Sequence, residues 1–142
     1  MMHHSFHFLT MKIFHYTNRG MTTKTRALDL FPGQPKILQV LLEHDGEKAR
    51  DIGRQCVMDK STMTGLLKKM EARGLITRRV SNEDKRVVNI FLTEKGREKA
   101  KQVNAIGAKI DEQALSVLSD EEKEILFRLL NKVLDNMEEN FE

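Results

Sequence analysis

Residues 47–92 read EKARDIGRQCVMDKSTMTGLLKKMEARGLITRRVSNEDKRVVNIFL, and this stretch decides the fold. Between Asp59 and Gly74 the apolar side chains follow the i, i+3, i+4, i+7 spacing of a helix with one buried side. Asp59 is favoured at a helix start, and Gly74 is favoured just beyond a helix end. The pattern therefore predicts a helix between them, with its buried side formed by Met63, Leu66, Leu67 and Met70.

The segment before this helix has a similar spacing, and its inward residues are Ala49, Ile52, Gly53 and Cys56. It predicts a shorter helix. Only Val57 and Met58 are left to form a turn before Asp59. Two short helices joined so tightly must cross at a steep angle.

Two runs of β-branched and aromatic residues follow, over residues 76–80 and 87–92. Val88, Ile90 and Leu92 alternate with their neighbours, which predicts strands, and the polar residues 81–86 join the two runs as a hairpin. A helix, a tight turn, a second helix and a basic ribbon in this order predict a mainly α fold with a small two-stranded β wing, a winged helix-turn-helix. Such a unit places one helix and one loop against DNA.

Three strings in this region, CVMDKSTMTGLLKKMEARGLITR, SNEDKR and VVNIFLTEKG, together with FPGQPKIL upstream, resemble the MarR family of bacterial transcription regulators. The resemblance covers about residues 28–100. It implies a homodimer that binds palindromic operators, usually as a repressor released by a small ligand or an oxidant. Two positions depart from the family pattern: Val57 stands where the family often has glycine, and Lys85 stands where it often has a second arginine.

Charge is distributed unevenly along the 142 residues, although the formal net charge is only +3. Residues 1–46 carry 5 basic and 3 acidic groups, residues 47–101 carry 15 and 8, and residues 102–142 carry 4 and 10. The basic middle suits contacts with phosphate, although ordinary solvated helix faces can give a similar patch. A chain of this length favours one self-sufficient domain. We expect a single domain over residues 1–142, with a DNA-binding lobe at about 30–100 and helical dimerisation regions at about 1–29 and 101–142.

Two helices are expected before residue 47. The first extends from about Phe6 to Arg26, could be interrupted at residues 18–20, and has on one side Phe6, Leu9, Ile13 and Tyr16. In the second helix, Pro32 and Pro35 are expected in the first turn, where a missing N–H does little harm. Asp45-Gly46 should end this helix, and its predicted buried residues are Ile37, Val40, Leu41 and Leu42.

Two further helices are expected after the wing. Residues 93–118 keep a helical period, and Ser119 with Glu122 forms a capping box that opens a final helix. The apolar stripe of that final helix contains Ile125, Leu126, Leu129, Leu130, Val133, Leu134 and Met137. Such a stripe must pack on something. A second copy of the chain is the favoured partner, with the first and last helices forming the dimer, and packing on the chain's own core is the alternative.

The helix after Asp59 carries most of the candidate DNA contacts on its outward faces. Residues near its start can reach base edges in the major groove, and the candidates are Ser61, Thr62, Thr64 and Gly65. Lysines suit phosphates, which position a helix without reading sequence, so Lys60, Lys68 and Lys69 are assigned to the DNA backbone. Ser61 and Thr62 could instead cap the helix locally.

The predicted wing mixes charges of both signs. Arg78 and Arg79 should point to opposite faces of their strand, so at most one of them can contact the DNA backbone, and Arg78 is the candidate. Lys85 adds a cation at the tip. By resemblance to the MarR family, Asp84 holds Arg86 in place while Arg86 enters the minor groove. The alternative is a solvated turn with an exposed ion pair, which contributes well under about 1 kcal/mol.

Regulation by an effector is implied by the resemblance alone. A small, largely apolar, anionic or phenolic ligand would bind between the dimerisation helices and the DNA-binding lobe, in a cleft with the candidate lining residues Phe14, Met21, Phe31 and Ile37. Cys56 occupies an apolar helix position, so core filling is favoured over redox sensing, which needs an accessible thiol close to cations. A redox-sensing regulator that uses Cys56 is kept as an alternative.

The sequence argues against other classes of protein. The histidines are His3, His4, His7, His15 and His44. Neither a Cys-x-x-Cys motif nor a neighbouring carboxylate accompanies the cluster His3, His4 and His7, so no metal or other cofactor is expected. Catalytic triads and glycine-rich phosphate loops are also absent, so an enzyme is not expected. A cytoplasmic location is expected, since neither an apolar run of 18 residues nor a convincing signal peptide is present. The competing class is a winged-helix module that binds protein instead of DNA.

Overall fold

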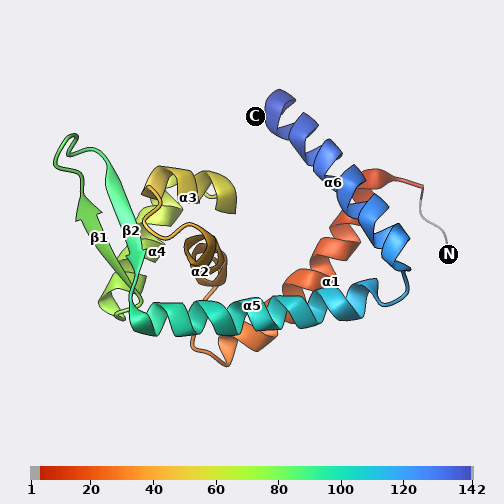
Figure 1. Cartoon of the computed structure of the whole chain (residues 1–142), viewed down its shortest axis with the longest axis horizontal. Helices are drawn as coiled ribbons and strands as arrows, with labels where there is room; N and C mark the ends of the chain where they lie inside the picture. The colour runs from red at the N-terminus through yellow and green to blue at the C-terminus, as the bar shows by residue number, and fades with distance from the viewer. Residues whose placement is uncertain (1–3, 142) are drawn as a thin grey trace. The chain divides into compact units, whose positions relative to one another are not determined.

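The computed structural model describes residues 4–141, so His3, one of the histidines considered as metal ligands, lies outside the described range. Within that range the elements are α1 (Phe6–Arg26), α2 (Gln34–Glu43), α3 (Ala49–Cys56), α4 (Lys60–Ala72), β1 (Ile76–Val80), β2 (Val88–Leu92), α5 (Glu94–Leu115) and α6 (Asp120–Asn140) (Figure 1). The two strands pair antiparallel, from Ile76 opposite Leu92 to Val80 opposite Val88. The predicted fold class, mainly helical with a small two-stranded wing, is therefore confirmed.

Helix α1 continues through residues 18–20, where the sequence suggested a break. Ser5 caps its start by accepting a hydrogen bond from the Phe8 N–H. The hydroxyls of Thr10 and Thr17 donate to carbonyl oxygens one turn earlier. An interior glycine costs a helix only about 1 kcal/mol relative to alanine, so Gly20 does not interrupt this one.

The start of α2 differs from the prediction. Gly33 is the N-cap, with a φ of 93°, and only Pro35 lies in the first turn. Pro32 precedes the cap, in a turn where the Phe31 N–H donates to Gln34 Oε1 at 3.0 Å. The prediction for Pro32 is wrong because the left-handed conformation of Gly33, which glycine adopts without steric cost, delays the helix start.

The buried side of α2 is also shifted. Ile37, Leu38 and Leu41 are fully buried, whereas Val40 and Leu42 are partly buried against the core. Leu38 was not predicted. Because α2 contacts both α3 and β2, the surface that it buries is wider than the single stripe expected from the sequence. The helix ends at Glu43 with His44 as its C-cap, directly before the predicted stop at Asp45-Gly46.

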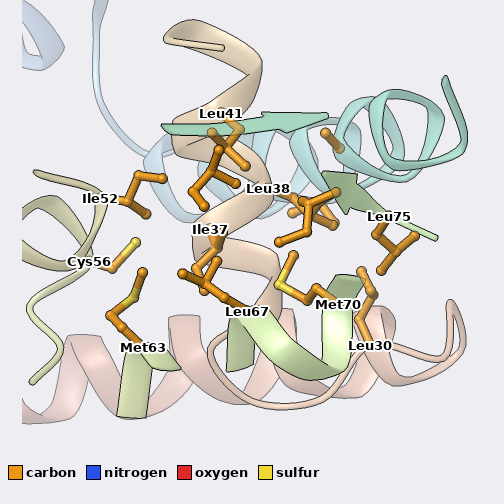
Figure 2. Close-up of a cluster of buried hydrophobic side chains, with 14 residues drawn as sticks. Leu30, Ile37, Leu38, Leu41, Ile52, Cys56, Met63, Leu67, Met70 and Leu75 are labelled. Atoms are coloured by element: carbon orange, nitrogen blue, oxygen red, sulfur yellow. The ribbon is translucent and has the colours of Figure 1, made fainter. Parts of the chain in front are cut away.

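One hydrophobic core joins α2, α3, α4, the hairpin and α5 (Figure 2). The predicted inward residues of α3 and α4 contribute Ile52, Cys56, Met63, Leu67 and Met70, and Leu66 packs against the edge of the core. The other members are Leu30, Ile37, Leu38, Leu41, Leu75, Ile76, Ile90, Ala100 and Val103. Gly96 lets α5 start close to this core, since a Cβ there would lie 1.9 Å from the Leu75 carbonyl oxygen.

The hairpin is tied to the loop that precedes α3. The Gly46 N–H donates to the Ile90 carbonyl at 2.8 Å, the Ile90 N–H donates to the Glu47 carbonyl at 2.9 Å, and Lys48 forms an isolated bridge with Asn89. The wing and the helix-turn-helix are therefore held in one frame.

Helix α5 is shorter than the predicted 93–118, because residues 116–118 form a turn. The capping box that opens α6 is confirmed: the Glu122 N–H donates to Ser119 Oγ at 3.2 Å, and the Ser119 N–H donates to Glu122 Oε1 at 3.0 Å. The chain divides into two compact units, Met1–Ala108 and Lys109–Glu142.

Helix α6 buries none of its residues within the single chain. Its apolar side chains are between 36% and 51% exposed at Ile125, Phe127, Leu129, Leu130, Val133, Leu134 and Met137. Among the described residues, no helix is both long and apolar enough to cross a membrane.

Candidate nucleic-acid interface

The turn between α3 and α4 depends on Val57. This residue has φ 55° and ψ 50°, which is the left-handed region, and it is 91% exposed. Its N–H donates to the Arg54 carbonyl, and the Met58 N–H donates to the Gly53 carbonyl at 2.9 Å. The predicted tight turn is thus present, with a β-branched residue in a conformation that costs about 1–2 kcal/mol outside glycine.

Replacing Val57 with glycine should stabilise the protein. Relief of the left-handed strain outweighs the roughly 0.5–1 kcal/mol of extra backbone freedom that glycine gives the unfolded chain, so the free energy of unfolding should rise by up to about 1 kcal/mol. Urea denaturation measures it. Val117, also exposed at 84% and outside the left-handed region, provides the control. Equal losses of stability in Val57→Gly and Val117→Gly would contradict the strain at Val57.

The start of α4 is capped by a carboxylate. Asp59 Oδ1 accepts a hydrogen bond from the Thr62 N–H at 2.7 Å, and this bond holds the pKa of Asp59 below its usual value. The Thr64 hydroxyl donates to the Lys60 carbonyl at 2.8 Å. The Thr62 side chain also hydrogen-bonds Asp59 and lowers its pKa further, as the local-capping alternative predicts, whereas within residues 4–141 the Ser61 hydroxyl forms no hydrogen bond.

The outward face of α4 matches the predicted set. All seven candidates are exposed, namely Lys60, Ser61, Thr62, Thr64, Gly65, Lys68 and Lys69. They alternate along the helix with the buried Met63, Leu67 and Met70. A Cβ at Gly65 would meet no atom within 4 Å, so the surface there is open.

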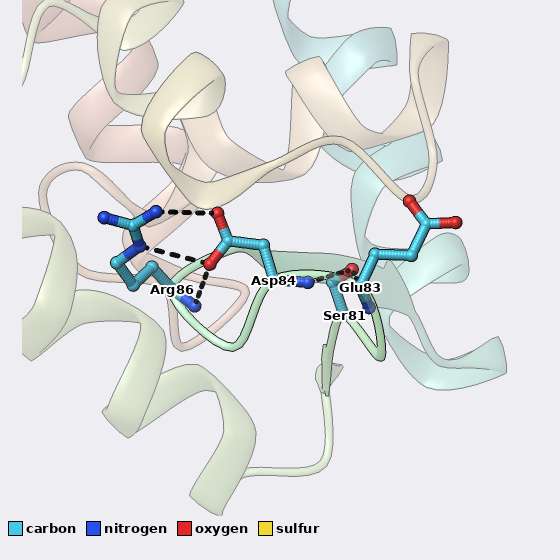
Figure 3. A network of polar contacts seen from close by, with 4 residues as sticks. All are labelled: Ser81, Glu83, Asp84 and Arg86. Atoms are coloured by element: carbon cyan, nitrogen blue, oxygen red, sulfur yellow. Dashed lines mark hydrogen bonds and ion pairs between the residues drawn. The ribbon is translucent and has the colours of Figure 1, made fainter.

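At the tip of the wing, Asp84 orients the side chain of Arg86 (Figure 3). Asp84 Oδ1 accepts from Arg86 Nε at 3.1 Å and from the Arg86 N–H at 3.0 Å, and Asp84 Oδ2 accepts from Nη2 at 3.3 Å. The Ser81 hydroxyl accepts from the N–H groups of Glu83 and Asp84, which shapes the turn. The side chain of Arg86 is nevertheless 91% exposed. Forked contacts of this kind fix the direction of a guanidinium, so the charge is held outward in one orientation.

The pairing of Asp84 with Arg86 should not change with pH near neutrality. The hydrogen bonds from the Arg86 side chain and backbone hold the pKa of Asp84 below its usual value. A carboxylate with a lowered pKa keeps its contribution above its ordinary pKa and loses it only as the pH falls through the lowered value. Binding measurements near neutral pH therefore all sample the paired wing.

The two strand arginines have different partners. Arg78 Nη2 forms an ion pair with Glu71 Oε1 of α4 at 3.0 Å. Arg79 lies over the Phe91 ring, with its guanidinium carbon 4.6 Å from the ring centroid. Their separation onto different partners agrees with the predicted opposite faces, and only Arg78 reaches the side of the wing that faces α4.

A groove of about 710 Å³ lies between the helix-turn-helix and the wing. Its floor is apolar, with Met58, Met63, Leu67, Val87 and Val88. One acidic residue, Asp84, lines it together with the six cations Lys48, Arg50, Arg54, Lys60, Arg78 and Arg86. Four predicted contacts thus meet around one basic groove with Asp84: Lys60, Thr64, Arg78 and Arg86. The other predicted contacts, Ser61, Thr62, Gly65, Lys68, Lys69 and Lys85, lie outside the groove on exposed surface.

Three of the groove cations were missed by the sequence reasoning, namely Lys48, Arg50 and Arg54. Arg50 and Arg54 are four residues apart, so they share one face of α3, and both lie near Asp51, at 3.9 Å and 3.6 Å. Their spacing opposite the apolar Ile52 and Cys56 was the available signal.

The predicted effector residues do not share one environment. Ile37 is fully buried in the core, so its assignment to a cleft is wrong for the single chain. The helical spacing of the apolar residues in α2 places Ile37 on the side of the helix that faces the core. Phe14 and Phe31 are 58% and 59% exposed, and Met21 is partly buried beside the core.

Cys56 lies in the core, 4% exposed, as the favoured reading of the sequence predicts. Burial raises the pKa of its thiol, and the charge of Lys36 opposes this effect only in part. The remaining histidines gather no metal site, since no group of three or more potential ligands occurs in the described part of the chain.

The Cys56 thiol should react slowly with a thiol reagent in the folded protein. Reaction requires the thiolate, and a raised pKa keeps the thiol neutral near pH 8. We expect labelling by an aromatic disulfide only at the rate at which the chain unfolds, and complete labelling in urea. Because the folded pKa is raised, the contribution of Cys56 to stability should be lost as the pH rises through that value. Rapid stoichiometric labelling of the folded protein would contradict burial.

Comparison with known proteins agrees with this geometry. The sequence model of the MarR family matches residues 30–88. The chain is 31% identical over 117 residues to the HTH-type transcriptional regulator YybA of Bacillus subtilis (strain 168), which covers 82% of this chain and 78% of that protein. It is 42% identical over 84 residues to the organic hydroperoxide resistance transcriptional regulator of the same organism, covering 56% of this chain and 57% of that protein. The crystal structure of the S. aureus MepR-DNA complex has 27% identity and a TM-score of 0.83, covering 94% of this chain and 99% of that one.

The exposed face of α4, the basic groove and the outward arginine of the wing define a winged helix-turn-helix protein with the surface of a DNA-binding regulator. The family follows from the shared sequence. The chain belongs to the MarR family of transcriptional regulators.

Proposed function

We propose that the protein is a repressor that binds palindromic operator DNA as a homodimer and is released by a small effector. The observation that carries the DNA part of this proposal is the aimed Arg86, which stands with five other cations around a groove bordered by α4. Cations with a fixed orientation suit phosphate and the minor groove, and the open face of α4 suits the major groove. A bacterial protein with this role acts in the cytoplasm, where the DNA lies.

Dimerisation is proposed because one chain presents only one helix, α4, to read bases in the major groove, and this reading helix covers one half-site. The exposed apolar stripe of α6 supports it, since contiguous apolar surface of this kind marks an interaction site. In a two-fold dimer the two α4 helices would enter successive major grooves. The centres of the half-sites would then lie about 34–36 Å apart.

Release by an effector rests on membership of the family. A ligand can change the separation of the reading helices only by the difference between its affinities for the two forms of the dimer. We propose a small apolar anion or phenol, with Phe14, Met21 and Phe31 near its site. The likeness to a hydroperoxide-resistance regulator favours an oxidant as a second candidate. Burial of Cys56 weighs against it, and release by peroxide that Cys56→Ser abolishes would support it.

A salt titration tests DNA binding against the competing protein-interaction module. Binding of a fluorescent duplex pool should weaken roughly 10³-fold or more between about 50 and 200 mM salt, because cations that meet phosphate release bound counterions. Replacing Lys68 and Lys69 together with alanine should reduce the magnitude of the salt slope by about two. Lys132→Ala on α6 provides the matched control and should leave the slope unchanged. A protein-interaction module would have no duplex affinity at any salt concentration.

A further inference from the structure

The connection between α1 and α2 is held by two cations from elsewhere in the fold. Arg73, the C-cap of α4, donates from Nη1 to the carbonyl oxygen of Asp29. Lys99 of α5 donates from Nζ to the carbonyl oxygen of Leu28 at 3.0 Å. Both carbonyls lie in the connection just beyond α1, which ends at Arg26 with Ala27 as its C-cap.

A buried amide joins the same contact. Gln34, at the start of α2, is 1% exposed. Its Oε1 accepts from the Phe31 N–H at 3.0 Å and lies 3.5 Å from Arg73 Nη1. Asp29 has a φ of 59°, so the chain at this point takes a conformation that non-glycine residues adopt only when their surroundings hold them there.

The contact is closed from the opposite side. Lys95 of α5 donates from Nζ to the carbonyl oxygen of Arg73 at 3.0 Å. The C-terminal end of α4 is therefore fixed to the α1–α2 connection by the side chain of Arg73, and to α5 by its backbone. Any displacement of the end of α1 must displace the end of α4 or break a charge-assisted hydrogen bond, which is among the stronger kinds.

We propose that Arg73 is a positioning residue that couples α1 to the reading helix and so fixes the separation of the two reading helices on DNA. This inference rests on the proposed function, because it needs a dimer that binds paired half-sites. Arg73 itself meets no base. A role in stability alone would weaken binding to every duplex by the same factor, whereas a role in positioning would change which half-site spacing is preferred.

The test uses the full chain and a duplex that the wild-type protein selects from a random library. One base pair is then inserted or removed between the half-sites, and affinities are measured by fluorescence anisotropy well below the melting temperature of each variant. For the wild type, one base pair should cost roughly tenfold in affinity, which lies within the range of a misplaced base contact. For Arg73→Ala, this penalty should fall below roughly threefold.

Three further variants sharpen the result. Arg73→Lys keeps the charge but lacks the planar guanidinium that contacts both the Asp29 carbonyl oxygen and Gln34 Oε1. Its spacing penalty should therefore lie between those of the wild type and Arg73→Ala. Lys99→Met, which loses the bond to Leu28 but keeps the aliphatic stem, should lower the penalty even if Arg73→Ala folds poorly. Lys101→Ala is the matched control, since Lys101 is exposed and, among residues 4–141, forms an ion pair only with Glu98 at 3.7 Å, and it should keep the wild-type penalty.

An unchanged ratio of affinities across the spacings in both Arg73→Ala and Lys99→Met would overturn the positioning role, while binding by the wild type would leave the proposed function standing. If the wild-type protein selected no duplex at all, the proposed function would fall first, and the inference with it.

Discussion

Leu130→Asp combined with Leu134→Asp should convert the protein from a dimer into a monomer and lower its operator affinity by several orders of magnitude. Both leucines are exposed in the single chain, at 44% and 51%, so the fold of one chain does not depend on them. Burying a leucine contributes roughly 1.5–3 kcal/mol, and a carboxylate in its place must also be desolvated. Two such changes should therefore weaken the dimer by more than roughly 4 kcal/mol, which is about a thousandfold.

Sedimentation velocity at micromolar concentration measures the dimer, and anisotropy with a selected duplex measures binding. The matched control is Arg128→Asp with Lys132→Asp, which alters charge more strongly on the opposite face of α6. The control should stay dimeric if the apolar stripe, and not the net charge, holds the two copies together. A Leu130 and Leu134 double variant that remained dimeric and bound DNA normally would contradict the role of α6.

Arg86→Ala should cost on the order of 1–3 kcal/mol, and the cost should be concentrated on operators with a narrow, A·T-rich flank. Such a flank has the strongly negative minor groove that attracts an inserted guanidinium. Lys68→Ala should instead weaken binding to all sequences alike, because a phosphate contact carries no sequence information. The two variants are compared on duplexes that differ only in their flanks.

Asp84→Ala extends the same comparison. It removes both carboxylate oxygens that orient the guanidinium of Arg86, but it leaves the charge in place. We expect part of the loss of flank preference seen in Arg86→Ala, together with a smaller loss of affinity. If Arg86→Ala left both affinity and flank preference unchanged, the wing would be only a structural hairpin.

Most of the fold could be predicted from the local spacing of apolar residues along the sequence. Met63, Leu67 and Met70 were assigned to the buried side of α4 because an isolated helix stripe repeats every three or four residues, and all three are buried. The capping box at Ser119 was equally local. By contrast, the start of α2 depends on the positive φ of Gly33, which neither Pro32 nor Pro35 reveals.

Residues that depend on distant neighbours were predicted less well. Arg50 and Arg54 share the exposed face of α3, but their spacing does not reveal that the wing folds back beside α3 and completes the groove there. Ile37 was assigned to a ligand cleft, although it is enclosed by the core. The pairing of Asp84 with Arg86 was implied by resemblance to the family, and the observed hydrogen bonds agree with it. The contact of Arg73 with Asp29 joins residues far apart in the sequence, and no motif announced it.

Hydroxyl-radical footprinting of the full-length protein on a duplex selected from a random library tests DNA binding most directly. Two protected segments should appear, with their centres about one helical turn apart, and the outer minor grooves should be protected where Arg86 of each copy inserts. In Arg86→Ala the outer protection should disappear while the central pattern persists. A folded, dimeric protein that protected no segment at any concentration, even at low salt, would contradict the assignment of α4 and the wing to DNA.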